Sequence, residues 1–176
     1  FVQILDPATG TGTFLVEVID IIFKTMKEKW EKDAGGPLTA NVQRKWNDYV
    51  PKHLLPRLHG YELMMAPYAI AHMKIGLKLY ETGYRFESDH RARVYLTNAL
   101  EPAKPFQISF EISALAREAK AVNSIKRNQI FTVIIGNPPY SFRSSNKSKF
   151  ILSLLDEYRK GLNERKPQLN DDYVKF

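Results

Sequence analysis

The feature that most constrains the fold is a glycine-rich turn near the start of the chain, Asp6-Pro7-Ala8-Thr9-Gly10-Thr11-Gly12-Thr13-Phe14. It follows an apolar run at residues 1–5 and precedes apolar positions that recur at helical spacing from Thr13 to about Trp30. A strand, a glycine turn and a helix in this order are typical of a nucleotide-type cofactor site. The glycines permit a tight turn and close approach of a ligand, and the helix directs its first amide groups at the turn.

A second short stretch, Asn137-Pro138-Pro139-Tyr140, follows another apolar run at residues 131–135. It is therefore expected at the carboxyl end of a strand. In an open parallel sheet the loops at these ends line one crevice, so turns about 125 residues apart in sequence are expected to face one another.

Between the two stretches, apolar patterns predict strands at 57–63 and 93–97 and helices near 67–80 and 111–122. An interruption at 32–56, with a short helix near 41–49, is assigned no chemistry, and a last helix is expected at 149–162. Alternating strands and helices predict an α/β fold with a parallel sheet flanked by helices. The expected inward residues are Ile70, Met73, Leu77 and Tyr80 in one helix and Ile151, Leu154, Leu155, Tyr158 and Leu162 in the last.

The chain has 176 residues, which suits one domain with a real core. It contains no cysteine, which excludes disulfides and thiol chemistry and suits a cytosolic protein. No apolar run approaches the roughly 18 residues of a membrane span, so no membrane partner is expected. The histidines are scattered, and only His59 lies near an expected strand end, so no metal site is expected.

The chain opens on Phe1, inside an expected strand, and we interpret it as a segment of a larger protein. Its net charge of +7 is uneven, and residues 141–176 carry eight basic and five acidic side chains. A basic surplus near the second stretch suits a phosphate-rich partner, although an ordinary solvated surface explains it equally well.

The acidic residues indicate which cofactor the glycine turn would accept. Asp6, at the end of the first strand, would repel a pyrophosphate but attract an ammonium or sulfonium group. Glu62, at the end of the second strand, matches the acidic residue that holds ribose hydroxyls in such sheets. Together with Gly10 and Gly12, these side chains favour S-adenosylmethionine over NAD. The alternative is a plain connection between a strand and a helix.

The second stretch has the groups to bind an aromatic amine. Consecutive prolines hold the loop rigid, because each has a fixed φ and no amide donor. The Asn137 side-chain oxygen and the Pro138 carbonyl could both accept hydrogen bonds from one NH2 group, which would direct the nitrogen lone pair at an electrophile. Tyr140 offers a face on which a planar base can stack. The alternative is a proline turn whose tyrosine merely packs.

Because it contains both motifs, the chain resembles the S-adenosylmethionine-dependent DNA adenine N6-methyltransferases. Further stretches resemble the large single-chain restriction–modification enzymes of the type I, type ISP or type IIG kind, often fused to helicase and nuclease parts. These stretches are Gly60-Tyr61-Glu62-Leu63, Pro67-Tyr68-Ala69-Ile70-Ala71, Tyr95-Leu96-Thr97-Asn98 and Asn170-Asp171-Asp172-Tyr173-Val174-Lys175-Phe176.

The resemblance implies an incomplete Rossmann-like class I methyltransferase core over 1–176, with a cofactor half at 1–100 and an adenine-binding region at 131–176. Its partners would be double-stranded DNA with a flipped-out adenine and other domains of the parent chain, in a prokaryotic cytoplasm. No target-recognition, helicase or nuclease domain is expected within these residues. Implied cofactor contacts are Asp6, Ala8, Thr9, Gly10, Gly12, Phe14, Glu62, Leu63, Asn98 and Ala99, and implied catalytic residues are Asn137, Pro138, Pro139 and Tyr140.

One position departs from the family pattern. Many relatives have an aspartate after the third strand that accepts a hydrogen bond from the cofactor's adenine, where this chain has Asn98. The amide oxygen can still accept that bond. Two alternatives stay open: a methyltransferase acting on a glutamine amide in translation release factors, which usually lacks Pro7, and a non-catalytic module that binds cofactor or DNA.

Overall fold

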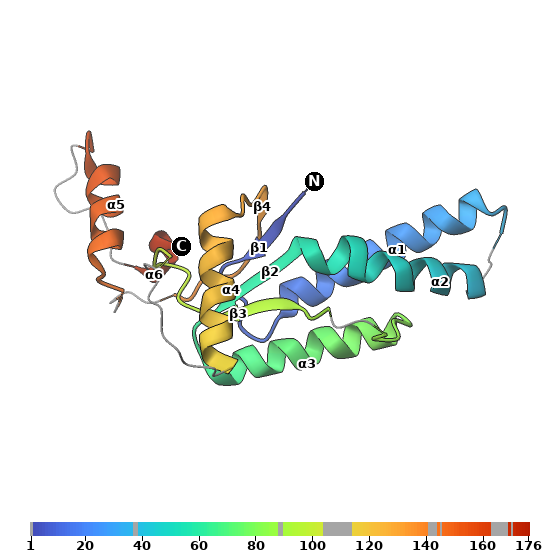
Figure 1. Cartoon of the computed structure of the whole chain (residues 1–176). Helices are drawn as coiled ribbons and strands as arrows, with labels where there is room; N and C mark the ends of the chain where they lie inside the picture. The colour runs from blue at the N-terminus through green and yellow to red at the C-terminus, as the bar shows by residue number, and fades with distance from the viewer. Residues whose placement is uncertain are drawn as a thin grey trace.

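The computed structural model describes residues 2–36, 39–87, 90–103, 114–140, 144, 146–162, 169 and 171–176 (Figure 1). Residues 111–113 of one expected helix and Asn170 of the last quoted stretch lie outside this range. The elements in chain order are β1 (Ile4–Asp6), α1 (Thr13–Asp33), α2 (Thr39–Tyr49), the π-helical turn η1 (Val50–Leu54), the 3-10 turn η2 (Leu55–Arg57), β2 (Leu58–Glu62), α3 (Met65–Glu81), β3 (Arg93–Leu96), α4 (Ala114–Asn128), β4 (Val133–Ile134), α5 (Lys149–Arg159) and α6 (Asp172–Lys175).

The four strands form one sheet in the order β3-β2-β1-β4, and all three pairings are parallel. In the central pairings Leu5 of β1 lies opposite His59 of β2 and Ile134 of β4. The parallel α/β fold expected from the sequence is confirmed. The chain adds strands outward from β1 to β3 and then returns to the other side of β1, so the topological switch point lies between β1 and β4. Ligands of open α/β sheets bind at such a point.

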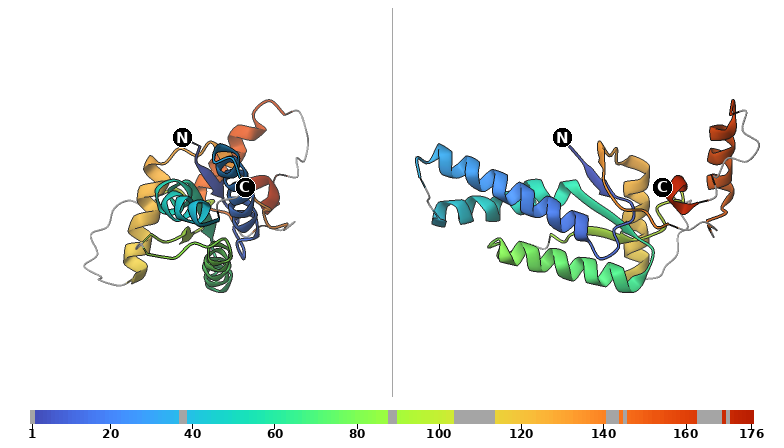
Figure 2. Two further views of the ribbon diagram at one scale, coloured as in Figure 1. Left: turned by 90° about the vertical axis from the view of Figure 1, so that its right-hand side faces the viewer. Right: turned by 180° about the vertical axis from the view of Figure 1, so that it is seen from behind.

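Helices cover both faces of this sheet (Figures 1 and 2). Helices α1 and α3 pack on the face that holds Val94, and α4 packs on the opposite face through Val122 against Tyr61 and Tyr95. Val94 and Tyr95 are consecutive, and their side chains point to opposite faces, as strand geometry requires.

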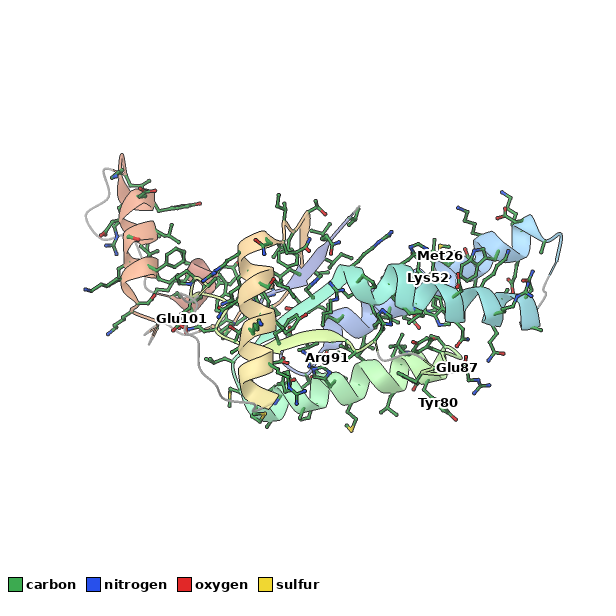
Figure 3. All side chains as sticks on the ribbon, viewed as in Figure 1. Met26, Lys52, Tyr80, Glu87, Arg91 and Glu101 are labelled. Atoms are coloured by element: carbon green, nitrogen blue, oxygen red, sulfur yellow. The ribbon has the colours of Figure 1, made fainter. Side chains whose placement is uncertain are left out.

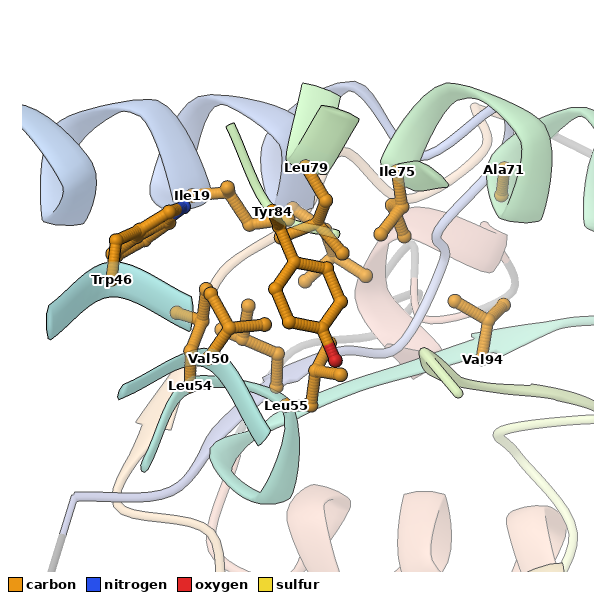
Figure 4. Close-up of a cluster of buried hydrophobic side chains, with 12 residues drawn as sticks. Ile19, Trp46, Val50, Leu54, Leu55, Ala71, Ile75, Leu79, Tyr84 and Val94 are labelled. Carbon is orange, nitrogen blue, oxygen red and sulfur yellow. The ribbon is translucent and has the colours of Figure 1, made fainter. Parts of the chain in front are cut away.

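The main core lies where α1, α2 and α3 meet beyond the amino ends of the strands (Figure 4). Trp46 is fully buried there, and its indole Nε1 donates to Thr82 Oγ1 at 3.0 Å. The segment 32–56, which was assigned no chemistry, therefore supplies much of the core. Its buried apolar residues are Val42, Trp46, Val50, Leu54 and Leu55.

The inward face of α3 was predicted wrongly. Its buried residues are Ala71, Ile75 and Leu79, spaced four apart. Apolar residues occupy both sides of this helix, so their period alone cannot select the buried side. Close approach to α1 selects the side with the small residue, because a Cβ on Gly12 would lie 3.1 Å from the Ala71 Cβ. The residues expected inside are 40% to 64% exposed, namely Ile70, Met73, Leu77 and Tyr80.

The last long helix also buries less than expected. Only Ile151 and Leu155 of α5 are buried, in a small cluster with Leu100. One turn separates these two residues, so the helix contacts its neighbours along a narrow stripe. Leu162 lies beyond the helix end at Arg159. The other three residues expected inside, Leu154, Tyr158 and Leu162, are exposed.

Candidate cofactor and base site

The glycine turn connects β1 to α1 as predicted. Thr9 is buried, and its amide donates to the Tyr61 carbonyl at 3.0 Å, which fixes the turn against β2. Gly10 and Gly12 have φ values of 54° and 80°, a region that side chains rarely adopt, and Gly12 caps α1. The turn therefore lies at the carboxyl edge of the sheet, between β1 and the start of α1. Ala8 is half-buried in it.

Asp6, the last residue of β1, is fully buried at the base of this turn. Its Oδ1 accepts from the Ala8 amide at 3.1 Å, whereas Oδ2 has no hydrogen-bond partner within the described ranges. Burial raises the pKa of Asp6 from 3.8 to about 6, the Ala8 amide opposes this, and the nearby Glu62 adds to it. A buried carboxylate oxygen without a donor is costly, and a cationic ligand would lower that cost.

Glu62 lies at the end of β2, as predicted, and faces the glycine turn. Its Oε2 accepts from the Gly10 amide and its Oε1 accepts from the Met64 amide, both at 2.8 Å. Each oxygen keeps a further lone pair, so the carboxylate can also accept from hydroxyl groups. Glu62 is thus brought to Asp6 and Gly10, from which it is distant in sequence. Leu63 follows directly and is 63% exposed.

Asn98 and Ala99 lie in the loop after β3, at the same edge of the sheet. The Asn98 Oδ1 accepts from the Leu100 amide at 3.0 Å, so the oxygen proposed to bind adenine has one lone pair in use. Lys126 of α4 holds this loop by donating to the carbonyls of Asn98 at 2.6 Å and Glu101 at 2.8 Å. Glu101 is labelled in Figure 3. Nothing in the sequence pattern identified Lys126, because its partners are backbone carbonyls.

The second stretch begins one residue after a close contact with β1. A Cβ on Gly136 would lie 2.7 Å from the Asp6 Oδ1 and 3.3 Å from the Pro7 Cδ. The two turns therefore meet at the switch point between β1 and β4. Sequence reasoning missed Gly136, whose signal was a glycine between the apolar run and Asn137. Phe14, by contrast, lies in the first turn of α1 and is 37% exposed.

The residues of the second stretch are mostly open to solvent. Asn137 and Pro139 are exposed, Pro138 is half-buried, and Tyr140 is 73% exposed. The Tyr140 hydroxyl donates to the Asn137 Oδ1 at 3.3 Å. The Tyr140 ring stacks on Tyr173 of α6, with 5.4 Å between ring centroids and 14° between ring planes.

A buried polar cluster behind this stack was not predicted. Asp172 of α6 accepts from the Ser144 hydroxyl and from the Asn146 Nδ2 at 2.8 Å. Its neighbour Tyr173 bears the stacked ring. The sequence pattern included both α6 residues but gave no reason to connect them with Asn146.

No helix in the described ranges is long and apolar enough to cross a membrane. Within the same ranges, no group of three or more histidine or carboxylate side chains is arranged to hold a metal ion.

Solved structures share this fold over 99% of the chain. The nuclease-deletion mutant of the Type ISP restriction-modification enzyme LlaGI, in complex with a DNA substrate mimic, has a TM-score of 0.68 at 24% identity. The DrdV-DNA complex has a TM-score of 0.65 at 28% identity, and the ATP-dependent Type ISP enzyme LlaBIII bound to DNA has 0.64 at 24%. The chain spans only 14%, 15% and 11% of those chains, respectively. No curated protein matches it significantly.

The fold and these neighbours define the class of protein as α/β, with a Rossmann-like parallel sheet flanked by helices. The sequence model of the Eco57I restriction-modification methylase family matches residues 58–176, more than half of the chain. The chain therefore belongs to the Eco57I restriction-modification methylase family. The matched residues include Glu62 and the stretch 137–140, while the glycine turn precedes them.

Proposed function

We propose that the chain is the cofactor- and base-binding core of a DNA methyltransferase. It would transfer a methyl group from S-adenosylmethionine to the N6 amino group of adenine, as part of a prokaryotic, cytoplasmic restriction–modification system. The observation that supports this most strongly is the contact between Gly136 and Asp6. A ligand held at the glycine turn and a base held at Asn137 would then lie side by side, because Asn137 directly follows the residue that contacts Asp6.

The residues of the first turn fit S-adenosylmethionine. The unpaired Oδ2 of Asp6 suits the ligand's ammonium group, and the free lone pairs of Glu62 suit ribose hydroxyls. Leu63 offers an exposed apolar side chain to the adenine ring, and Asn98 offers its second lone pair to the adenine amino group. The walls of the cofactor site would be formed by Ala8, Thr9, Gly12 and Ala99. Such a cofactor supplies a methyl group bound to a positively charged sulfur.

The second stretch would orient the acceptor nitrogen. The Asn137 Oδ1 and the Pro138 carbonyl would accept both hydrogens of the adenine amino group, which disfavours conjugation with the ring and leaves the lone pair on nitrogen. Pro139 would keep that loop rigid, and Tyr140 would stack on the flipped base. Because Asn137 is exposed, the proton lost from the methylated nitrogen has a route to solvent.

Three observations favour DNA over a glutamine amide as the acceptor. The chain belongs to a restriction-modification methylase family. The DrdV structure, at 28% identity, is a complex with DNA. The region around and beyond the second stretch has a surplus of basic side chains.

The test is methyl transfer from labelled S-adenosylmethionine to mixed-sequence duplex DNA, followed by nucleoside analysis. Label in N6-methyl-2′-deoxyadenosine is the expected result. Label in a cytosine, or in a glutamine-containing peptide but not in DNA, would overturn the proposal. In a parallel titration, the Glu62→Ala variant should bind the cofactor about tenfold more weakly than wild type, since a charged hydrogen-bond acceptor is removed. Glu81→Ala, at the exposed end of α3, is the matched control.

A further inference from the structure

The polar cluster at α6 binds the loop that follows the base-binding stretch. Asp172 is only 7% exposed, and it accepts from the Ser144 hydroxyl and from the Asn146 Nδ2. The Asn146 amide in turn donates to the Ser144 Oγ at 3.0 Å, and Lys175 Nζ donates to the Asn146 carbonyl at 2.8 Å. A buried carboxylate with two donors fixes its neighbours in position, since removing it would leave buried donors unpaired.

One side of this cluster reaches the loop proposed to bind the cofactor's adenine. The Asn98 Nδ2 donates to the Asn146 Oδ1 at 3.4 Å. Lys126 holds the same loop from the α4 side through the Asn98 carbonyl. Asn98 is thus held by two polar partners, Lys126 on α4 and Asn146.

The other side reaches the face proposed to bind the target base. Tyr173 follows Asp172 directly, and its ring stacks on Tyr140. Both rings are largely exposed, at 54% and 73%, so burial of the rings does not hold the stack. Tyr173 is instead held by α6, where Asp171 accepts from its amide at 3.0 Å and Asp172 anchors the helix.

We infer that Asp172 is a positioning residue that couples the cofactor side of the site to the base side, through Asn146 to Asn98 and through the chain to Tyr173. This inference rests on the proposed function. Asp172 touches neither ligand in it, and its effect is on the placement of residues that do.

The geometry of the ring stack explains why binding of the base would affect binding of the cofactor. Two aromatic contacts of about 3.5 Å need roughly 7 Å between the outer rings if a base is to lie between them. The observed 5.4 Å is too short, so a base that enters between the two rings displaces Tyr173. Because Asp172 joins Tyr173 to Asn146, this displacement moves the partner of Asn98. A ligand that fixes Asn98 therefore changes the free energy of that displacement.

The first measurement concerns ring placement and needs no ligand. Contacts between the Tyr140 and Tyr173 rings are measured by nuclear Overhauser effects in the 176-residue chain and in two variants. Asp172→Ala should lose the ring contacts. Asp172→Asn should keep them, since its amide oxygen still accepts from Asn146 and Ser144. Asp156→Ala, an exposed aspartate on α5, is the matched control and should change nothing. Unchanged ring contacts in a folded Asp172→Ala variant would overturn the inference.

The second measurement is the coupling itself. S-adenosylhomocysteine is titrated with and without a duplex that contains 2-aminopurine, whose fluorescence reports the flipped base. In the wild-type chain each ligand should change the affinity of the other by roughly fivefold or more, and Asp172→Ala should reduce that factor to about one. Asn146→Ala should give the same loss while Asp172 keeps its hydrogen bond from Ser144, which covers the case in which Asp172→Ala does not fold.

The two proposals fail in different ways. Coupling that persists unchanged in Asn146→Ala and Asp172→Ala overturns the role of the cluster and leaves the proposed function intact. A folded wild-type chain that binds neither probe, while its ring contacts behave as expected, overturns the proposed function and the coupling role with it.

Discussion

The two halves of the site differ in how firmly the free protein holds them. On the cofactor side, Asp6 and Thr9 are buried, and the Glu62 carboxylate is fixed by two backbone amides. On the base side, Asn137 and Tyr140 are exposed, and one hydrogen bond of 3.3 Å and a ring stack hold them. β4, the strand that precedes them, has two residues and is exposed as well. The cofactor half is therefore preorganised, whereas the base half has a resting arrangement that a ligand must replace.

The largest expected effect comes from Asn137→Ala, which separates the halves most cleanly. It removes an acceptor for the base amino group and no contact with the glycine turn. Methyl transfer should fall by about 10² to 10³, the usual cost of removing one positioned polar group at a reacting centre. Cofactor affinity, measured by calorimetry, should not change.

Asn128→Ala, an exposed asparagine at the end of α4, is the matched control for this variant. A loss of cofactor binding in Asn137→Ala equal to its loss of methyl transfer would show that the halves are not separate. Full activity in a folded Asn137→Ala variant would show that Asn137 does not orient the acceptor nitrogen.

Asp6→Asn tests how much the buried charge of Asp6, in the cofactor half, lowers the free energy of unfolding. Folding raises the pKa of Asp6 from 3.8 to about 6, so the folded chain binds a proton more tightly than the unfolded chain does. At pH 7 the buried charge therefore costs about 3 kcal/mol, and the cost disappears as the pH falls below 4. The variant should be more stable than wild type at pH 7 by about 1–2 kcal/mol, after about 1 kcal/mol for its unpaired amide.

Denaturant unfolding at pH 7 and pH 4 measures this gain, which should vanish at the lower pH. Cofactor affinity should fall in the same variant, because the charge that suits an ammonium group is gone. Asp20→Asn is a control of opposite sign, since its hydrogen bond with Lys24 lowers the pKa of Asp20. A variant less stable than wild type at pH 7 would show that Asp6 is a structural anchor instead.

Gly136→Ala tests the contact between the halves. The new Cβ would lie 2.7 Å from the Asp6 Oδ1, which is too close for residue 136 and the Asp6 side chain both to keep their positions. We expect a loss of about 1–3 kcal/mol in the free energy of unfolding, as for other overpacked sites. Gly76→Ala is the matched control, because open space surrounds that helical position, and it should gain about 0.5–1 kcal/mol. Thermal unfolding of the two variants should therefore shift in opposite directions.

The preorganised half was also the more predictable one. The glycine turn and the carboxylates at Asp6 and Glu62 follow from local order along the chain, because a strand end, a turn and a helix start fix their own geometry. The buried face of α3 did not follow, since that helix carries apolar residues on both sides and only tertiary contacts select one. The apolar side of α5 was predicted too wide, because its neighbours cover only Ile151 and Leu155. The contact of Gly136 with Asp6 depends on β4 pairing with β1, a long-range choice that no local pattern records.

The polar cluster shows a further limit on prediction. Asp172, Asn146 and Ser144 are ordinary polar residues in loops and a short helix, and no periodicity sets them apart. Their significance appears only when the fold brings α6 against Ser144 and Asn146. The assignments of individual residues to cofactor and base remain predictions, and the variants above test them one by one.

The smallest effect is expected from Tyr140→Phe, and it tests whether the base half is held in a resting state. The hydroxyl donates to the same Asn137 oxygen that the base amino group would use. Removing an exposed hydrogen bond of 3.3 Å should cost about 0.5 kcal/mol of stability or less. It also removes a competitor for Asn137, so the KM for DNA should fall by about twofold while kcat stays the same. Tyr158→Phe, at another exposed tyrosine, should change neither quantity. A tenfold fall in kcat for Tyr140→Phe would instead mean that the hydroxyl acts on the reacting base, and the base half would then be preorganised too.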